Sequence, residues 1–210
     1  MKLTFLGAPG AGKGTQAAVV AQKLGIPTIS TGNMLREAVE AQTEVGLKAK
    51  AFMESGGLVP DDVIIGILDE RLRKDDCRKG FILDGVPRTV AQAEALETRG
   101  IKLDCVVSLE VDDEDIKRRM SGRRVCLKCG ATYHVTDNPS KDGVTCDVCG
   151  DKLVQRADDA PETVASRLAV YHEKTEPLKN FYAGLGTLKT VKADVSIDEV
   201  TKAVFAALGI

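Results

Sequence analysis

The sequence predicts an α/β protein built on a parallel sheet that carries helices on both faces. Three features of the 210-residue chain support this prediction. Short apolar runs alternate with longer amphipathic segments, which is the pattern of parallel strands joined by crossover helices. A glycine-rich stretch follows the first apolar run, where such a chain turns from strand to helix. A cysteine-containing segment interrupts the alternation once, which predicts a small insert within one main domain.

The individual elements follow from the apolar periodicity and from the residues that begin helices. Five runs are predicted as strands: residues 2–6, 27–29, 80–83, 104–111 and 187–192. Helices are predicted at residues 14–24, 32–42, 61–73, 89–99, 112–121, 161–183 and 196–208. Thr31, Thr89 and Ser196 are candidate N-caps, and Pro161 suits a first helical turn.

The charge balance argues against a dedicated nucleic-acid or membrane-surface protein. The chain has 29 Lys and Arg against 31 Asp and Glu, for a net charge of −2. Because it shows no charged-then-apolar leader and no apolar run of membrane length, we expect a cytoplasmic protein. In a reducing compartment its six cysteines are expected to be thiols or metal ligands. Cys77 and Cys105 stand alone in apolar contexts and are predicted to be small buried hydrophobic residues.

The remaining four cysteines have the spacing of a metal knuckle. Cys126 and Cys129 form one Cys-x-x-Cys pair, and Cys146 and Cys149 form another, each followed by a glycine. This pattern predicts a structural zinc site with four thiolates, although iron or cobalt would also fit four sulfur ligands. His134 could replace one thiolate.

Two other functions for the insert, residues 122–159, stay open at this stage. A zinc-ribbon nucleic-acid-binding module is disfavoured because six basic and six acidic side chains leave the insert without net charge. A dithiol redox sensor would use the same cysteines. Bound metal in protein purified under reducing conditions would argue against the redox sensor.

The first fifteen residues, MKLTFLGAPGAGKGT, indicate a phosphate-binding loop. Glycines let successive backbone N–H groups point toward a polyphosphate, and the following helix adds its positive N-terminal end. Lys13 supplies a mobile charge, and Thr15 can reach a magnesium ion or a phosphate oxygen. The strict pattern places Ser or Thr directly after the lysine, whereas Gly14 intervenes here. Asp84, at the end of an apolar strand, is a candidate carboxylate for the magnesium shell.

Several further motifs point to one family. They are STGNMLR at residues 30–36, DGVPRT at 84–89 with Gln92, GRR at 122–124, and RADD at 156–159 followed by Arg167. Together with GAPGAGKGT, they closely resemble adenylate kinases of the long-lid bacterial type, and the resemblance runs from end to end of the chain. It implies a P-loop nucleoside monophosphate kinase fold with a five-stranded parallel sheet, an inserted AMP-binding flap and a metal-binding lid. The implied reaction is ATP + AMP ⇌ 2 ADP with Mg²⁺, in a monomer.

The resemblance also implies a domain division and a set of site residues. The core would comprise residues 1–29, 60–121 and 160–210, the flap residues 30–59 and the lid residues 122–159. ATP would contact Gly10, Ala11, Gly12, Lys13, Gly14, Thr15, Arg119, Arg123, Thr132, Tyr133 and Val195. AMP would contact Thr31, Arg36, Gly57, Leu58, Val59, Gly85, Val86, Pro87, Arg88, Gln92, Arg156 and Arg167. The catalytic set would be Lys13, Arg88, Arg123, Arg156 and Arg167.

Two positions depart from the family pattern. Asn33 stands where Asp is common, which removes a negative charge near the magnesium waters, and Val86 replaces a commoner Phe. Thr31 and Gln92 fit adenine through hydroxyl and amide pairing, but a kinase of different base preference remains an alternative. Because phosphoryl transfer needs charge stabilisation and no protein nucleophile, His134 and His172 are predicted to be structural or surface groups.

Overall fold

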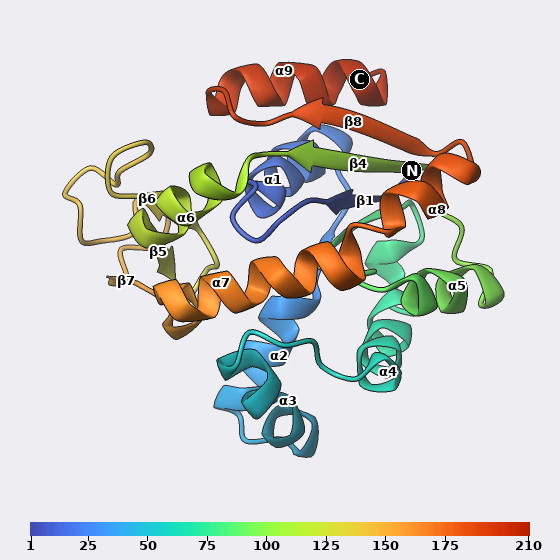
Figure 1. Ribbon diagram of the computed structural model, residues 1–210, viewed down its shortest axis with the longest axis horizontal. Coiled ribbons are helices and arrows are strands. Elements are labelled where there is room, and N and C mark those ends of the chain that lie inside the picture. The colour runs from blue at the N-terminus through green and yellow to red at the C-terminus, as the bar shows by residue number, and fades with distance from the viewer.

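The computed structural model describes residues 1–210 and contains a central five-stranded sheet. Its strands are β1 (Lys2–Leu6), β2 (Thr28–Ser30), β3 (Phe81–Asp84), β4 (Cys105–Glu110) and β8 (Leu188–Lys192). They lie in the order β2-β3-β1-β4-β8, and every neighbouring pair is parallel. The five predicted strands and their parallel pairing are therefore confirmed, with ends that shift by one residue at most sites (Figure 1).

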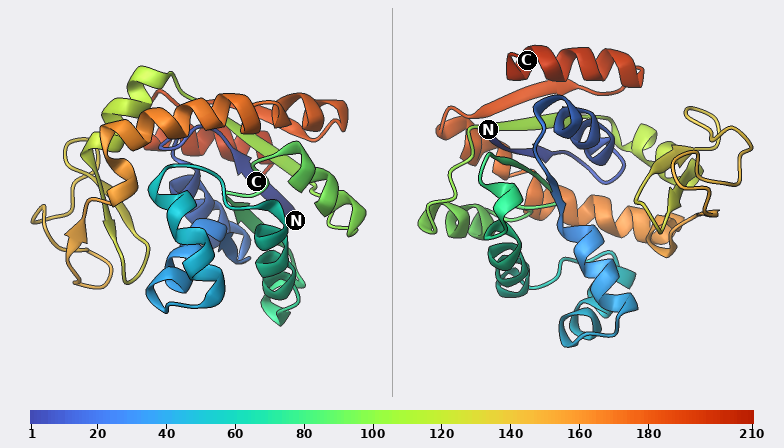
Figure 2. Two further views of the ribbon diagram at one scale, coloured as in Figure 1. Left: turned by 60° about the horizontal axis from the view of Figure 1, so that its bottom comes forward. Right: turned by 180° about the vertical axis from the view of Figure 1, so that it is seen from behind.

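Helices cover both faces of this sheet, as predicted. They are α1 (Lys13–Leu24), α2 (Thr31–Glu40), α3 (Glu44–Glu54), α4 (Asp61–Leu72), α5 (Val90–Thr98), α6 (Asp113–Gly122), α7 (Pro161–Val170), α8 (Leu178–Gly184) and α9 (Ile197–Leu208). Successive residues of a buried strand enter opposite cores: Val107 packs with residues of α1, α6, α7 and α9, whereas Val106 packs with residues of α2, α4, α5 and α8. The tilted view and the view from behind show helices on either side of the strands (Figure 2). No helix combines the length and apolarity needed to cross a bilayer.

One helix prediction was wrong, and one helix was not predicted. Residues 161–183 do not form one helix, because a π-helical turn (Tyr171–Thr175) separates α7 from α8. Pro177 has no N–H to continue the regular ladder, and Glu176 N–H donates instead to the Tyr171 carbonyl, five residues back. The helix α3 was missed altogether. It begins at Thr43, whose hydroxyl accepts from Gly46 N–H.

The predicted helix starts were mostly confirmed. Thr89 and Ser196 are N-caps whose hydroxyls accept backbone N–H groups, and Pro161 occupies the first turn of α7. The prediction that Thr31 is an N-cap was wrong, because the N-cap of α2 is Ser30 and Thr31 already lies inside the helix. Its hydroxyl donates to the Gly85 carbonyl, 3.1 Å away, and is therefore used for a tertiary contact.

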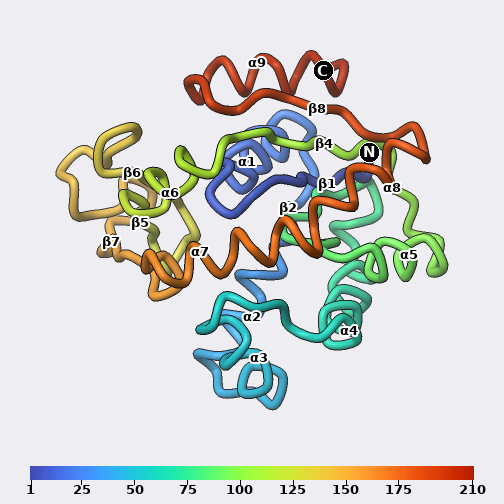
Figure 3. Tube along the Cα trace, in the orientation of Figure 1, coloured from blue at the N-terminus to red at the C-terminus, as the bar shows by residue number.

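The interruption of the α/β pattern forms a second, smaller sheet. Strands β5 (Arg123–Cys126), β6 (Thr132–His134) and β7 (Leu153–Val154) pair antiparallel in the order β6-β5-β7. In the chain trace this segment projects beyond the end of α6, at the left, while α2 and α3 project below the central sheet (Figure 3). We call residues 122–159 the lid segment and residues 30–59 the flap segment.

Candidate functional site

The candidate site begins where β1 and β3 end side by side. Phe5 of β1 lies opposite Asp84 of β3, so the loop after β1 and the Asp84 carboxylate meet at one edge of the sheet. Gly10 and Gly12 in this loop have φ of 82° and 98°, a left-handed conformation that favours glycine. A Cβ on Gly10 would also lie 2.8 Å from Met120 Sδ, which leaves no room for a larger residue. The sequence-predicted loop therefore turns as expected into the N-terminus of α1.

The Lys13 side chain folds back over this loop. Its Nζ donates to the carbonyl oxygens of Gly7 and Ala8, each at 2.7 Å. Burial lowers the pKa of Lys13 to about 7; Asp84 opposes this shift, and nearby arginines reinforce it. A phosphate anion would supply the opposite charge that the buried ammonium lacks.

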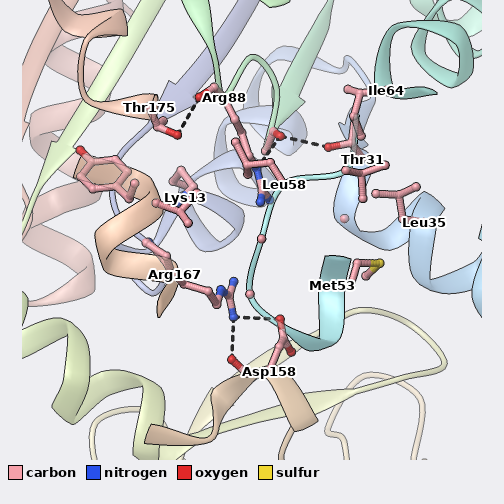
Figure 4. Close-up of a pocket in the computed structure, with 18 of the residues that line it drawn as sticks. Lys13, Thr31, Leu35, Met53, Leu58, Ile64, Arg88, Asp158, Arg167 and Thr175 are labelled. Carbon is pink, nitrogen blue, oxygen red and sulfur yellow. Dashed lines mark hydrogen bonds and ion pairs between the residues drawn. The ribbon is translucent and has the colours of Figure 1, made fainter. Parts of the chain in front are cut away.

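A cavity beside Lys13 gathers most of the residues predicted to contact AMP. Its lining includes Lys13, Thr31, Arg36, Gly57, Leu58, Val59, Gly85, Pro87, Arg88, Gln92, Arg156 and Arg167. Figure 4 shows Lys13, Arg88 and Arg167 on one side of this space, with Thr31, Leu35 and Ile64 on the other. Val86 is the exception, because it is buried behind the wall, where its carbonyl accepts from the Thr4 hydroxyl at 2.8 Å.

The arginines predicted as catalytic residues or as AMP contacts fall into two groups. Arg123 is paired with the buried Asp159, and Arg156 and Arg167 both pair with Asp158, at 2.5 and 2.8 Å. Burial raises the pKa of Asp158, but the charges of Arg167 and Arg156 outweigh it and hold the pKa below its ordinary value. Three of the predicted phosphate ligands thus already have carboxylate partners within the protein.

The other group has only neutral partners. The Arg88 Nε donates to the Gly85 carbonyl at 2.9 Å, and Arg36 donates to the Asn33 side-chain oxygen. Burial, together with the charge of Arg156, lowers the pKa of Arg36 to about 10. Neither guanidinium is paired with a carboxylate oxygen within 4.0 Å, so the negative charges nearest to them, Asp84 for Arg88 and Asp158 for Arg36, act only at longer range. An anionic group in the cavity would compensate both positive charges.

Gln92 lies in the cavity wall and is 2% exposed. Its Oε1 accepts from Arg88 N–H at 2.7 Å, and its Nε2 donates to Asp61 Oδ1 at 2.6 Å. Sequence reasoning missed Asp61, which lies 31 residues before Gln92. It also assigned no role to Asp158 or Asp159. The available signals were the acidic start of α4 and the RADD stretch beside the predicted arginines.

The residues predicted around the rest of ATP lie outside this cavity, and the structure brings only some of them together. Arg119 of α6 donates to the Ala193 carbonyl at 2.7 Å, which places it beside the turn that contains the exposed Val195. Thr132 is exposed on β6. Tyr133 directs its hydroxyl toward the cysteines, where it lies 3.6 Å from Cys146 Sγ and accepts from Asp147 N–H.

The four cysteines of the lid segment converge although they are as much as 23 residues apart. Their sulfur atoms all lie within 4.8 Å of one another, with Cys126 and Cys149 at 3.4 Å and Cys129 and Cys146 at 3.5 Å. Four thiolates at about 2.3 Å from a tetrahedral zinc would be separated by about 3.8 Å, so the cluster fits such an ion. His134 is not part of this cluster. Cys77 and Cys105 are buried elsewhere, as predicted.

Neither histidine lines the cavity. His134 packs against Gly122, and its Nδ1 accepts from Asp137 N–H at 3.0 Å. His172 lies at the surface between Asp113 and Glu176. These positions match the structural and surface roles predicted for them.

Comparison with known proteins identifies the family. The sequence model of adenylate kinase matches residues 5–187. Adenylate kinases from Caldicellulosiruptor saccharolyticus and Lachnospira eligens are 53% and 50% identical to this chain, with both sequences covered in full. An adenylate kinase from Carboxydothermus hydrogenoformans is 51% identical over 99% of each chain. With its parallel sheet, phosphate-loop geometry, arginine-lined cavity and cysteine cluster, the chain belongs to the adenylate kinase family.

Proposed function

We propose that this nucleoside monophosphate kinase transfers a phosphoryl group reversibly from Mg-ATP to AMP and forms two molecules of ADP. The observation that carries the proposal is the cavity beside the phosphate loop. It collects Arg36, Arg88, Arg156 and Arg167 next to Lys13, in a chain that is 50–53% identical to adenylate kinases. Such a surplus of buried positive charge suits two phosphate chains that must be brought together.

The reaction needs charge stabilisation and alignment more than it needs a base. Lys13 and the backbone N–H groups of residues 10–15 would hold the outer phosphates of ATP, and Arg36 and Arg88 the phosphate of AMP. Arg123, Arg156 and Arg167 would neutralise the group in transfer. Arg119, Thr132, Tyr133 and Val195 would contact the remainder of ATP.

Asp84 is the residue best placed to hold the magnesium that accompanies ATP. Its Oδ2 lies 3.7 Å from the position that a Cβ on Gly14 would occupy, at the mouth of the phosphate loop. Mg²⁺ prefers carboxylate, phosphate and water oxygens, so this donor fits. The ion would neutralise phosphate charge; the protein's part is to position the oxygen atoms around it.

We further propose that the flap and lid segments are mobile domains that close over the nucleotides and exclude water. Contacts between distant segments support the closed arrangement in this proposal: Ser166 of α7 donates to the Ser55 carbonyl of the flap at 3.1 Å. The Asn33 amide of the flap also lies 3.5 Å from where a Cβ on Gly130 of the lid would sit. Excluding water would prevent ATP from being hydrolysed in place of transferring to AMP.

Zinc is the proposed metal of the lid segment, with a structural role. Four sulfur ligands leave no vacant coordination position for chemistry, and this small segment has a hydrophobic cluster of only three buried residues, two of them cysteines. A stoichiometry of one zinc per chain in protein purified under reducing conditions is expected. Metal-free protein with full thermal stability would instead favour the redox interpretation.

The proposed specificity is tested by measuring ADP formation from ATP with AMP, CMP, UMP and GMP at equal concentration. AMP should react fastest. A faster reaction with CMP or UMP would assign the chain to a nucleoside monophosphate kinase of different base preference.

A further inference from the structure

The side chain of Gln92 has a single allowed orientation, because its two ends meet partners of opposite polarity. Arg88 N–H can only donate, so the atom that faces it at 2.7 Å must be the amide oxygen. Asp61 as a carboxylate can only accept, so the atom 2.6 Å from its Oδ1 must be the amide nitrogen. These two contacts assign oxygen and nitrogen independently of each other.

The partners of Gln92 are themselves held in place. Thr89 donates its hydroxyl proton to Asp61 Oδ2 at 2.9 Å, and its oxygen accepts from Gln92 N–H at 3.1 Å. Asp61 therefore uses both carboxylate oxygens and joins the start of α4 to the N-cap of α5. Rotating the Gln92 amide by 180° would place its NH₂ against Arg88 N–H and its oxygen against the Asp61 carboxylate, and both contacts would be repulsive.

The locked amide still has one unused donor and one unused acceptor. Nε2 carries a second proton, and Oε1 has a second lone pair, while Gln92 lines the cavity. A side-chain amide in this state matches adenine, whose 6-amino group donates and whose neighbouring ring nitrogen accepts. A 6-oxopurine reverses both groups, with an accepting oxygen and an N–H. It would match only the flipped amide.

Thr31 supports the same polarity. Its hydroxyl proton is donated to the Gly85 carbonyl at 3.1 Å, which leaves only lone pairs for a ligand. A hydroxyl that can only accept a hydrogen bond favours an amino group on the nucleobase over a carbonyl group.

We propose that Asp61 is a positioning residue that sets purine specificity by locking the Gln92 amide in the orientation that accepts 6-aminopurine and rejects 6-oxopurine monophosphates. Asp61 does not line the cavity and would act only through Gln92. The inference rests on the proposed function, since it assumes that Gln92 contacts the base of the monophosphate.

The test compares kcat/KM for AMP and IMP, because these substrates differ only at the 6-position and the adjacent ring nitrogen. In Asp61→Ala, the ratio of kcat/KM for AMP to that for IMP should fall by up to about tenfold, because only the Arg88 N–H contact would then oppose rotation of the amide and one bidentate base contact discriminates by about this factor or more. Asp61→Asn should lower it less, because its side-chain oxygen can still accept from Gln92. Asp62→Asn is the matched control; it removes the adjacent, exposed carboxylate from the same helical turn and should leave the ratio unchanged.

A purely structural role for Asp61 would change the absolute rates and leave the ratio intact, and that result would overturn the proposal. Gln92→Ala tests whether Gln92 contacts the base, separately from whether Asp61 fixes its orientation. If this variant keeps the wild-type ratio, Gln92 does not read the base, and the assumption drawn from the proposed function is wrong. If Gln92→Ala lowers the ratio and Asp61→Ala does not, Gln92 contacts the base but Asp61 does not control its orientation. In the Gln92→Ala background, Asp61→Ala should cause no further change in the ratio.

Discussion

Arg167 is bound to Asp158 through both the side chain and the backbone. Its Nη1 lies 2.8 Å from Asp158 Oδ2 and 2.9 Å from the Asp158 carbonyl oxygen. This pair links α7 with the end of the lid segment, and Arg156 shares the same carboxylate. Asp158 therefore supplies these arginines with the kind of negative charge that a phosphate would supply in the proposed complex.

The first prediction concerns the stability of this arrangement. Asp158→Asn should destabilise the ligand-free protein by about 2 kcal/mol, because two largely buried guanidinium groups lose a charged hydrogen-bond partner. Saturating ATP should restore part of the loss, since its phosphates would supply the missing charge. Thermal unfolding with and without ATP measures both effects. Asp75→Asn, which removes the exposed pair with Arg78, should change stability by less than about 1 kcal/mol. If ATP raised the stability of wild type and of Asp158→Asn by the same amount, its phosphates would not be replacing the charge of Asp158, and the prediction would be contradicted.

The second prediction concerns catalysis. Lys13→Met and Arg88→Ala should each lower kcat by at least about a hundredfold, because both groups are expected to contact oxygens whose charge shifts during transfer. Steady-state kinetics with AMP and ATP varied separately measures this, with Lys174→Met as an exposed control. A near-normal kcat with only a raised KM would show that the residue binds ground state and transition state equally.

The third prediction uses the pH dependence of a surface contact. His172 Nδ1 is 2.9 Å from Glu176, and its Nε2 is 3.1 Å from Asp113 of α6; Lys179 and Glu110 continue the cluster. Hydrogen bonding to Glu176, followed by that to Asp113, raises the pKa of His172 above its ordinary 6.5. The protonated form therefore stabilises the fold below pH 6.5, and the contribution disappears as the pH rises through the raised folded-state pKa.

His172→Gln should consequently lower the melting temperature at about pH 6 and leave it almost unchanged at about pH 9. The difference should correspond to at most about 1 kcal/mol, because both ion pairs are substantially exposed. Thermal unfolding at the two pH values checks this. A deficit of the same size at both would mean that packing or a neutral hydrogen bond matters more than the charge.

The fourth prediction separates the metal's structural contribution from catalysis. Making Cys126→Ser with Cys129→Ser, or removing metal with a chelator, should lower the melting temperature clearly. A structural zinc contributes on the order of 10 kcal/mol to local folding at neutral pH. Only part of this should appear in global stability, because the lid segment can unfold locally while the core sheet stays folded.

Much of the activity should survive at low temperature in this metal-free protein. Chelator-dependent thermal inactivation, measured beside activity at low temperature, tests the prediction, and Cys105→Ala outside the cluster serves as a control. Complete loss of turnover with the core still folded by circular dichroism would assign the metal a catalytic role.

Local patterns in the sequence determined much of this protein. The five strands, most helix boundaries, the phosphate loop and each Cys-x-x-Cys pair are encoded by neighbouring residues, because periodicity, glycine spacing and Cys-x-x-Cys spacing act over a few positions. The exceptions are α3, whose pattern is interrupted by Gly46, and the π-helical turn, which immediately precedes Glu176 and Pro177. Gly46 lies inside α3 because any side chain there would overlap the Ala38 backbone, and that requirement exists only once α2 and α3 have packed.

Only the tertiary structure decided which polar and charged groups meet. Asp61 reaches Gln92 across 31 residues, and Arg123 reaches Asp159 across 36. The sequence shows that these side chains exist and can form hydrogen bonds, but it contains no local pattern that joins them. Their pairing depends on how α4 packs against α5 and how the lid segment returns to α7. For the same reason, the sequence could indicate which arginines face a nucleotide, while the fold alone determined that Arg36 and Arg88 lack carboxylate partners and Arg123, Arg156 and Arg167 have them.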